Sequence, residues 1–205
     1  MLEDALALMS ERGIAGASLR ALAKRVGMSQ PSLYHYFPTK SALIPQIVEY
    51  GARRMLGTGL ALPPPKRIQD LPRYVVDAVL ALYETETHPR FVRLLFLVAI
   101  EAKEHHAFVK RVFEEQLDPS FGVLADAFAK NPSERRELRE VLRMVVYSLG
   151  FMMLDDRALF ARPAPKPTTL DYAKWVVSTA EQLILERCPE SVAAAPPARS
   201  AERPI

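Results

Sequence analysis

Apolar residues recur along most of the chain at intervals of three and four positions, and no stretch alternates apolar with polar residues as a half-buried strand does. Gly13 and Gly27 interrupt this pattern at points where glycine commonly closes a helix. Ser18 and Ser29 stand just before new apolar runs, where a helix N-cap is expected. The pattern therefore predicts an all-α chain that opens with helices over about residues 1–12, 18–26 and 29–37 and a fourth that begins at Thr39 or Ser41 and runs to about Leu56.

The rest of the chain has longer helical segments. After a stiff, non-helical connection at Pro63–Pro65, the spacing predicts helices near residues 70–86, 89–104, 105–117, 120–130, 134–155 and 169–187, with breaks at prolines such as Pro119. The last two helices are apolar around most of their circumference, so we expect a second copy of the chain to cover them.

The composition changes again near the C-terminus. From Pro189 onward the chain consists largely of Ala, Pro, Ser and Arg, which predicts a disordered tail. The expected units are therefore residues 1–56, 57–188 and 189–205.

Overall composition is that of an ordinary globular protein, with 205 residues of which 49% are hydrophobic. The single cysteine, Cys188, cannot form an intramolecular disulfide, so a reducing cytoplasm is the simplest compartment. No apolar run approaches the ~18 to 20 residues that span a bilayer, and we expect no membrane segment. The formal excess of +3 lies entirely within residues 1–54, as expected if that part contacts a polyanion.

Residues 18–40 carry the most specific pattern. Two short helices around Gly27 predict a helix-turn-helix, with Ala23 small at the helix crossing and Leu33 packing the second helix onto the first. The second helix is nearly uncharged yet rich in side chains that can reach base edges and phosphates, namely Gln30, Ser32, Tyr34, His35 and Tyr36. Lys40, at the start of the next helix, can contact a phosphate together with the free amides there. The alternative is a short αα-hairpin in an unrelated bundle.

Residues 2–56 resemble the DNA-binding domain of the TetR family of transcriptional regulators. The segments that carry the resemblance are Ser18–Arg20 with Ala23, Gly27–Ser29, Pro31–Phe37 and Lys40–Leu43. The resemblance implies base or groove contacts from Arg20, Gln30, Pro31, Ser32 and Tyr36 and phosphate contacts from Ser18, Tyr34 and Lys40, with Ser29 and His35 on the same surface. It implies an all-α fold in which a three-helix, helix-turn-helix DNA-binding domain precedes a C-terminal helical ligand-binding and dimerisation bundle.

For the whole chain, the resemblance implies a transcription regulator, most simply a repressor, in the cytoplasm and associated with the nucleoid. It would bind a palindromic double-stranded DNA operator as a homodimer formed through residues 134–155 and 169–187. A small, largely apolar effector would release the DNA. No cofactor is expected.

Candidate residues for the effector pocket are mostly aromatic, although aromatic and methionine side chains at helical spacing are more often plain core. The candidates are Phe91, Arg93, Leu95, Phe96, Phe108, Phe113, Phe121, Phe128, Met144, Tyr147 and Phe151. Arg93 interrupts an apolar run; it would bind an anionic ligand, extend to water, or pair with Glu86 or Glu101.

Two other classes stay open: a ligand-independent DNA-binding activator or architectural protein, and a helical lipid-binding bundle or enzyme. The common catalytic motifs are absent from the sequence, so we do not expect an enzyme. Glu101 and His105 share a helix face, but the adjacent His105 and His106 point apart. Solvated or partly buried histidines are therefore favoured over a metal site.

Two features depart from the TetR pattern. The basic segment that usually precedes the first helix is missing, because Met1 falls inside that helix; this questions either the start of the chain or its minor-groove arm. Pro45 lies within the predicted fourth helix, where it removes a hydrogen bond and can kink the axis. Because this helix links the DNA-binding and sensing parts, we hypothesise that Pro45 makes a hinge.

Overall fold

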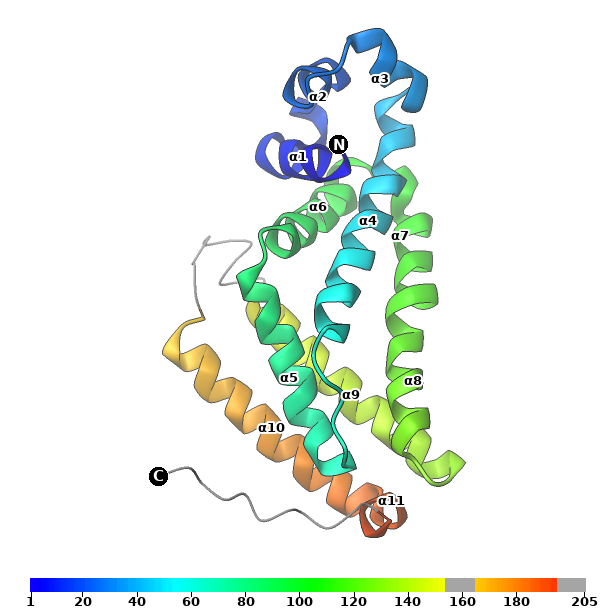
Figure 1. Cartoon of the computed structure of the whole chain (residues 1–205), viewed down its shortest axis with the longest axis vertical. Coiled ribbons are helices and arrows are strands. Elements are labelled where there is room, and N and C mark those ends of the chain that lie inside the picture. The colour runs from blue at the N-terminus through cyan, green and yellow to red at the C-terminus, as the bar shows by residue number, and fades with distance from the viewer. Residues whose placement is uncertain (154–164, 195–205) are drawn as a thin grey trace.

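The computed structural model of the protein describes residues 1–153 and 165–194 (Figure 1). Within these ranges the regular elements are helices, which confirms the predicted all-α fold. The first four are α1 (Leu2–Gly16), α2 (Leu19–Arg25), α3 (Gln30–Tyr36) and α4 (Lys40–Leu60). They are followed by α5 (Leu71–Ala81), α6 (Thr87–Glu101), α7 (His106–Val112), α8 (Asp118–Phe128), α9 (Pro132–Met153), α10 (Pro167–Arg187) and α11 (Pro189–Ala193). Short 3-10 turns lie at Ile68–Asp70, Leu82–Glu84 and Lys103–His105.

The N-terminal helices begin where their capping side chains predict. Ser18 Oγ accepts a hydrogen bond from the Ala21 amide at 3.1 Å, and Thr39 Oγ1 accepts one from the Ala42 amide at 3.1 Å. Such a bond satisfies an amide that has no partner within its helix. Thr39, and not Ser41, therefore opens α4.

Helix α1 breaks at the glycine expected to end it. Gly13 has φ +74°, and the chain makes one further turn to Gly16 before α2. A residue with a Cβ atom is strained at this φ, so the break belongs to the glycine. Helix α1 thus consists of a longer piece before Gly13 and a single turn after it, with a kink between them.

Helix α4 connects the two ends of the molecule. It runs from the helix-turn-helix at one end toward the long helices α9 and α10 at the other (Figure 1). It continues through Pro45 and past the predicted end at Leu56. The hinge hypothesis at Pro45 stays a prediction.

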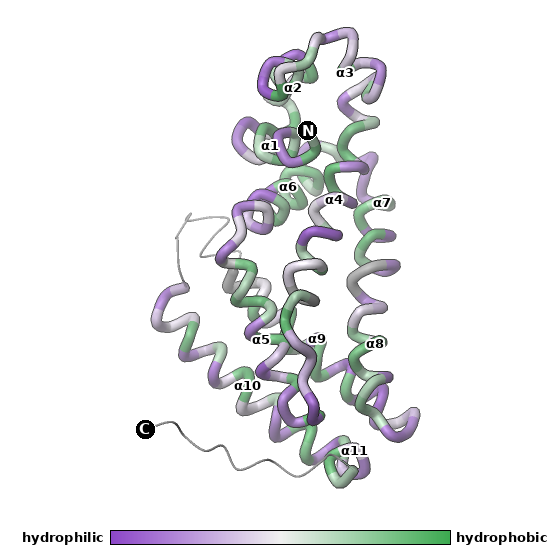
Figure 2. Tube along the Cα trace, viewed as in Figure 1, coloured by the Kyte–Doolittle hydropathy of each residue, from purple (hydrophilic) through white to green (hydrophobic). Residues whose placement is uncertain are grey.

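The core has two parts. The first joins α1–α4 to α6 and to Val112 of α7, and the second joins α5 with α8, α9 and α10. Figure 2 shows hydrophobic and hydrophilic residues mixed along each helix, as expected when every helix turns one side inward. Met55, near the end of α4, packs against both parts. The first core extends beyond residue 56 into α6, so it does not stop at the predicted domain boundary, and that boundary stays a prediction.

The predicted break at Pro119 is wrong. A π-helical segment, Phe113–Leu117, joins α7 to α8, so residues 106–128 form one continuous helical rod. A proline inside an α-helix lacks an amide hydrogen and clashes with the preceding turn. The wider π turn just before Pro119 is where the rod changes its hydrogen-bond pattern, and this accommodates the proline.

The prediction of disorder from residue 189 is also wrong for its first part. Helix α11 packs Ser191 into the structure at 3% exposure, and the buried Glu134 carboxylate accepts the amides of Glu190 and Ser191 at 2.8 and 3.0 Å. These bonds satisfy the free amides at the start of α11. Residues 195–205 of the expected tail and residues 154–155 of the expected helix lie outside the described residues.

Candidate DNA-binding surface and apolar cavity

Helices α2 and α3 pack as a helix-turn-helix. Leu22, Ala23 and Leu33 are buried where the two helices cross, and the Met28 amide donates to the Ala23 carbonyl at 2.9 Å across the turn. Gly27 makes the turn with φ +67°. Packing thus uses the residues that the sequence pattern assigned to it, and leaves the outer side of α3 exposed.

The exposed side of α3 carries the predicted DNA-contacting side chains. Gln30, Pro31, Ser32 and His35 are exposed, and Tyr34 and Tyr36 expose 42% and 59% of their surfaces. The His35 and Tyr36 rings lie edge to face with centroids 5.8 Å apart. Large aromatic side chains left in solvent on a short helix are unusual for a structural element and suit contact with a partner.

The electrostatic setting is one-sided. No Asp or Glu occurs in residues 12–48, a stretch that covers α2, α3 and the start of α4. Arg20 is exposed at the start of α2, beside the same surface. A phosphate backbone that approaches α3 therefore meets no carboxylate from this stretch of the chain, which lowers the cost of bringing a polyanion to this end.

The side-chain hydroxyl groups of Ser29 and Ser32 already have hydrogen-bonding partners in each other. Ser29 Oγ accepts the Ser32 amide at 3.2 Å as the N-cap of α3, and the two hydroxyl oxygens lie 2.7 Å apart. Ser18 Oγ is engaged in the same way as the cap of α2. A hydroxyl group can both donate and accept, so each retains capacity for one further bond.

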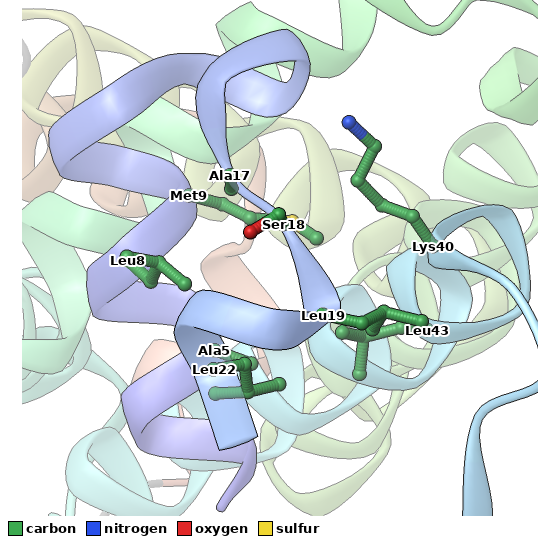
Figure 3. Close-up of a pocket in the computed structure, with 9 residues that line it drawn as sticks. All are labelled: Ala5, Leu8, Met9, Ala17, Ser18, Leu19, Leu22, Lys40 and Leu43. Atoms are coloured by element: carbon green, nitrogen blue, oxygen red, sulfur yellow. The ribbon is translucent and has the colours of Figure 1, made fainter. Parts of the chain in front are cut away.

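Lys40 lies differently from the sequence expectation. Its Nζ donates to the carbonyl oxygens of Ile14 and Ala15 at 2.6 and 3.3 Å, and so closes the last turn of α1. The gap that Lys40 borders together with Ser18 and apolar residues of α1, α2 and α4 has a volume of only about 10 Å³ (Figure 3). This region is therefore packed core, and the ammonium would have to share its carbonyl partners with any phosphate.

A bidentate ion pair fixes α2 against α1. Arg25 donates to both carboxylate oxygens of Glu11, at 2.9 and 3.0 Å. This bond lowers the pKa of the Glu11 carboxyl and raises the pKa of the Arg25 guanidinium. The pair is largely exposed, so it contributes orientation more than stability.

Helix α1 is held to α6 at both ends. Near its start, Glu3 accepts hydrogen bonds from Thr87 at 3.1 Å and from Arg90 at 3.4 Å. Near its end, the Ala15 amide donates to Glu101 Oε2 at 2.8 Å. Because residues at the two starts and at the two ends pair, α1 and α6 run parallel. Both ends of α1 are thus tied to α6 by side-chain contacts.

The other side of α6 faces an apolar cavity of about 430 Å³. It lies between α4, α6, the π-helical segment, α8 and α9, and its lining residues are Met55, His88, Phe91, Val92, Leu95, Phe96, Ala99, Phe113, Phe121, Val146, Tyr147 and Gly150. Phe96 and Tyr147 are 48% and 62% exposed, so the cavity opens to solvent between α6 and α9. Its size falls within the range of small-molecule sites.

Six of the predicted pocket residues lie together in this lining: Phe91, Leu95, Phe96, Phe113, Phe121 and Tyr147. Four others lie elsewhere. Arg93 is exposed on α6, Phe108 packs on the first core with the Arg111 guanidinium 5.6 Å from its ring centroid, and Phe128 and Met144 pack on the second core. The Phe151 side chain lies outside the described residues.

The sequence reasoning missed the lining residues Met55, His88, Val92, Ala99, Val146 and Gly150. Val92 and Ala99 lie within a turn of Phe96 and Leu95, so helical periodicity on α6 would have found them. Met55 had no such signal, because it lies on α4, which the sequence analysis assigned to the DNA-binding domain. Only the packing of α4 against α6 brings it to the cavity.

The histidines considered for a metal site have hydrogen-bonding neighbours. His105 Nε2 lies 3.1 Å from Ser41 Oγ, and His106 Nε2 lies 3.1 Å from the Ala99 carbonyl. In the part of the chain that the structure describes, no three His, Cys, Asp or Glu side chains gather as metal ligands would. None of the helices described has the length and hydropathy needed to cross a membrane.

Fold and surface together define a helix-turn-helix protein with an exposed second helix, whose remaining helices border an apolar cavity. Residues 1–47 match the family model of the bacterial regulatory proteins of the tetR family. The first 47 residues thus confirm the resemblance that the motifs predicted.

Individual relatives agree. The uncharacterized HTH-type transcriptional regulator YvdT of Bacillus subtilis is 41% identical over 49 residues, which are 24% of this chain. The match spans only 25% of YvdT. A solved structure from Mesorhizobium loti, described as a TetR-family transcriptional regulator, superposes with a TM-score of 0.64 at 14% identity, covering 90% of this chain and 93% of that one. A transcriptional regulator from Rhodococcus superposes with a TM-score of 0.61 at 18% identity, covering 90% and 95%. At these identities the structures show a shared fold.

Proposed function

We propose that the protein is a TetR-type transcription regulator, in the main a repressor, which binds a palindromic operator as a homodimer and is released by a small, largely apolar ligand. The observation that carries the proposal is the exposed, uncharged side of α3, where Gln30, Tyr34 and Tyr36 stand in solvent. A side chain set of this kind suits a major groove. We place the protein in the cytoplasm, on the nucleoid.

The contact roles are those that the TetR resemblance implies. Arg20, Gln30, Pro31, Ser32 and Tyr36 are proposed to contact bases or groove walls, and Ser18, Tyr34 and Lys40 to contact phosphates, with Ser29 and His35 alongside. Lys40 would do so from its place at the end of α1, as a shared partner of carbonyl and phosphate oxygens.

The homodimer, formed through residues 134–155 and 169–187, is supported by exposed apolar side chains on α10. Leu170, Trp175 and Leu185 are 40%, 60% and 51% exposed on this helix. Large apolar side chains left in solvent are typical of a protein–protein interface. A two-fold axis there would place two α3 helices on one side of the duplex and require an operator with matching symmetry.

The ligand response is supported by the position of α6 between the cavity and α1. Phe91 lines the cavity and also fills the space directly over Gly51 of α4, where not even a methyl group would fit. A ligand that displaces α6 or α4 therefore acts on both supports of the DNA-binding end. A coupling of ~1 to 3 kcal/mol would release the DNA.

The first test is binding to the DNA that flanks the protein's own gene, measured by fluorescence anisotropy against excess unrelated DNA over a salt series. We expect saturable binding that resists the competitor, with a footprint of two symmetric half-sites. Tyr34→Ala should weaken operator and unrelated DNA alike, while Gln30→Ala should mainly reduce the preference for the operator. Gln46→Ala, at an exposed position of α4, is the matched control. Reversal of the two patterns would contradict the proposed roles.

A ligand-independent activator or architectural protein is the second candidate. It would bind the same DNA, but no small molecule would change the affinity. Equal binding to operator and unrelated DNA would instead contradict sequence-specific regulation altogether.

A further inference from the structure

The cavity has a second chamber. A space of about 140 Å³ lies between the end of α4, α5 and α8, and it shares three lining residues with the larger chamber: Met55, Phe121 and Val146. The two spaces are therefore neighbours separated by a thin partition of side chains. Together they form a longer apolar volume than either alone.

Met55 is the movable part of this partition. It is only partly buried, it lines both chambers, and it packs against both parts of the core. An unbranched methionine side chain can change shape at low cost, whereas the Phe121 ring and the β-branched Val146 are stiffer.

The lining of both chambers has no carboxylate, ammonium or guanidinium group: among the described residues that line them there is no Asp, Glu, Lys or Arg. Arg93, the cation expected to bind an anionic ligand, is exposed on α6 and is not part of the lining. An ionised carboxylate placed here would lose its hydration and meet no Lys or Arg. Polar side chains are limited to His88 and Tyr147 in the larger chamber and to Tyr74 and Ser120 in the smaller one.

From these observations we infer that the cavity takes an elongated, uncharged, apolar molecule with one hydrogen-bonding end group, whose tail reaches the smaller chamber by displacing Met55. The end group would lie beside His88 or Tyr147 in the larger chamber. This inference names the ligand class for the proposed regulator and rests on that proposal for its biological meaning.

The same geometry gives a route to the DNA. Met55 stands 15 residues after the start of α4 at Lys40, which is about 22 Å along the helix axis. A tail that occupies the partition therefore pushes on the far end of the helix that carries the helix-turn-helix. Short ligands that fill only the larger chamber would bind without this push.

The test uses Nile red, an uncharged apolar dye, displaced from the full chain by straight-chain alcohols from hexanol to dodecanol and by the carboxylates of equal length. Each added methylene should tighten displacement about fourfold, which corresponds to about 0.8 kcal/mol per buried methylene. Each carboxylate should bind at least about tenfold more weakly than its alcohol. Equal affinity of alcohols and carboxylates would overturn the inference.

Three variants test the partition. Met55→Phe should block the passage between the two chambers. The affinity for alcohols should then stop rising at a shorter chain length, which is the length limit, while hexanol binds as in the wild type. Met55→Leu is the volume-conserving control and should keep the dependence on chain length. Leu124→Phe fills the smaller chamber from α8 without touching the larger one, and should shorten the limit in the same way even if Met55→Phe fails to fold. An unchanged limit in Leu124→Phe would overturn the two-chamber inference.

The effect on DNA is measured separately by anisotropy with dodecanol present. If the affinity for alcohols rises with chain length but operator binding is unchanged, the result would support the ligand class and contradict the release of DNA by the ligand. Operator binding by a protein from which no alcohol displaces Nile red would overturn the ligand class and leave the regulator proposal standing.

Discussion

Gly51→Ala tests the close packing of α4 on α6. The added Cβ atom would lie 2.1 Å from Cδ2 and 2.6 Å from Cγ of Phe91, well inside van der Waals contact. Phe91 is buried in the first core, and the open space beside its ring is the cavity that it lines. Overpacking of this kind costs about 1 to 3 kcal/mol, while replacing a helical glycine by alanine gains about 0.5 to 1 kcal/mol. We expect a net loss of about 1 kcal/mol in the free energy of unfolding.

Gly57→Ala is the matched control on the same helix. A Cβ atom at Gly57 meets nothing within 4 Å, so this variant should be stabilised by about 0.5 to 1 kcal/mol. Urea unfolding followed by circular dichroism, at equal protein concentrations, gives both values. The Phe91 ring displaced by Gly51→Ala should also weaken Nile red binding. Equal stability of the two variants would refute the reasoning, because only the Cβ atom at Gly51 meets a neighbouring side chain.

Three further predictions concern single contacts. Glu101→Ala removes the acceptor of the Ala15 amide, so hydrogen exchange at Ala15 should accelerate and about 0.5 to 1.5 kcal/mol of stability should be lost; unchanged exchange would contradict the clamp between α1 and α6. The hydrogen bond from Arg25 lowers the pKa of Glu11 below its ordinary value of 4.5. The ionised carboxylate therefore stabilises the fold above that pH, and this stabilisation is lost as the pH falls through the pKa of the folded state. The free energy of unfolding of Glu11→Gln should accordingly fall less steeply with decreasing pH than that of the wild type. Burial raises the pKa of the Cys188 thiol to about 11, so a disulfide reagent at mildly alkaline pH should label it only as fast as α11 opens, and a rapid first phase would contradict this packing.

The helix-turn-helix was predictable because its signals act over short distances along the chain. A cap such as Ser18 or Thr39 binds an amide three residues away, and Gly27 sets its own backbone angle. The two apolar sides that meet at Leu33 are visible as helical spacing in the sequence. These parts required no knowledge of distant packing.

The cavity was only half predictable, because periodicity tells which side of a helix is apolar but not which neighbour faces it. Phe91 and Phe121 were expected, yet Met55 joins them from a helix assigned to another domain. Arg93 could not be placed by spacing alone, since a rotation of α6 by a fraction of a turn decides between cavity and solvent. The sequence did not predict that the Lys40 ammonium donates to a carbonyl oxygen of α1, because only the break at Gly13 places that oxygen beside it.

The π segment at Phe113–Leu117 also determines in which direction the side chains of α8 point relative to those of α7. In an uninterrupted α-helix each residue advances by about 100°, so Phe113 and Phe121 would point about 80° apart. One extra residue taken up in a wide turn removes about 100° of rotation and brings the two rings to within about 20° of one direction. Both rings line the cavity. A deletion of one residue in this segment would therefore act as a twist, turning the whole of α8 and presenting a different set of side chains to any bound molecule.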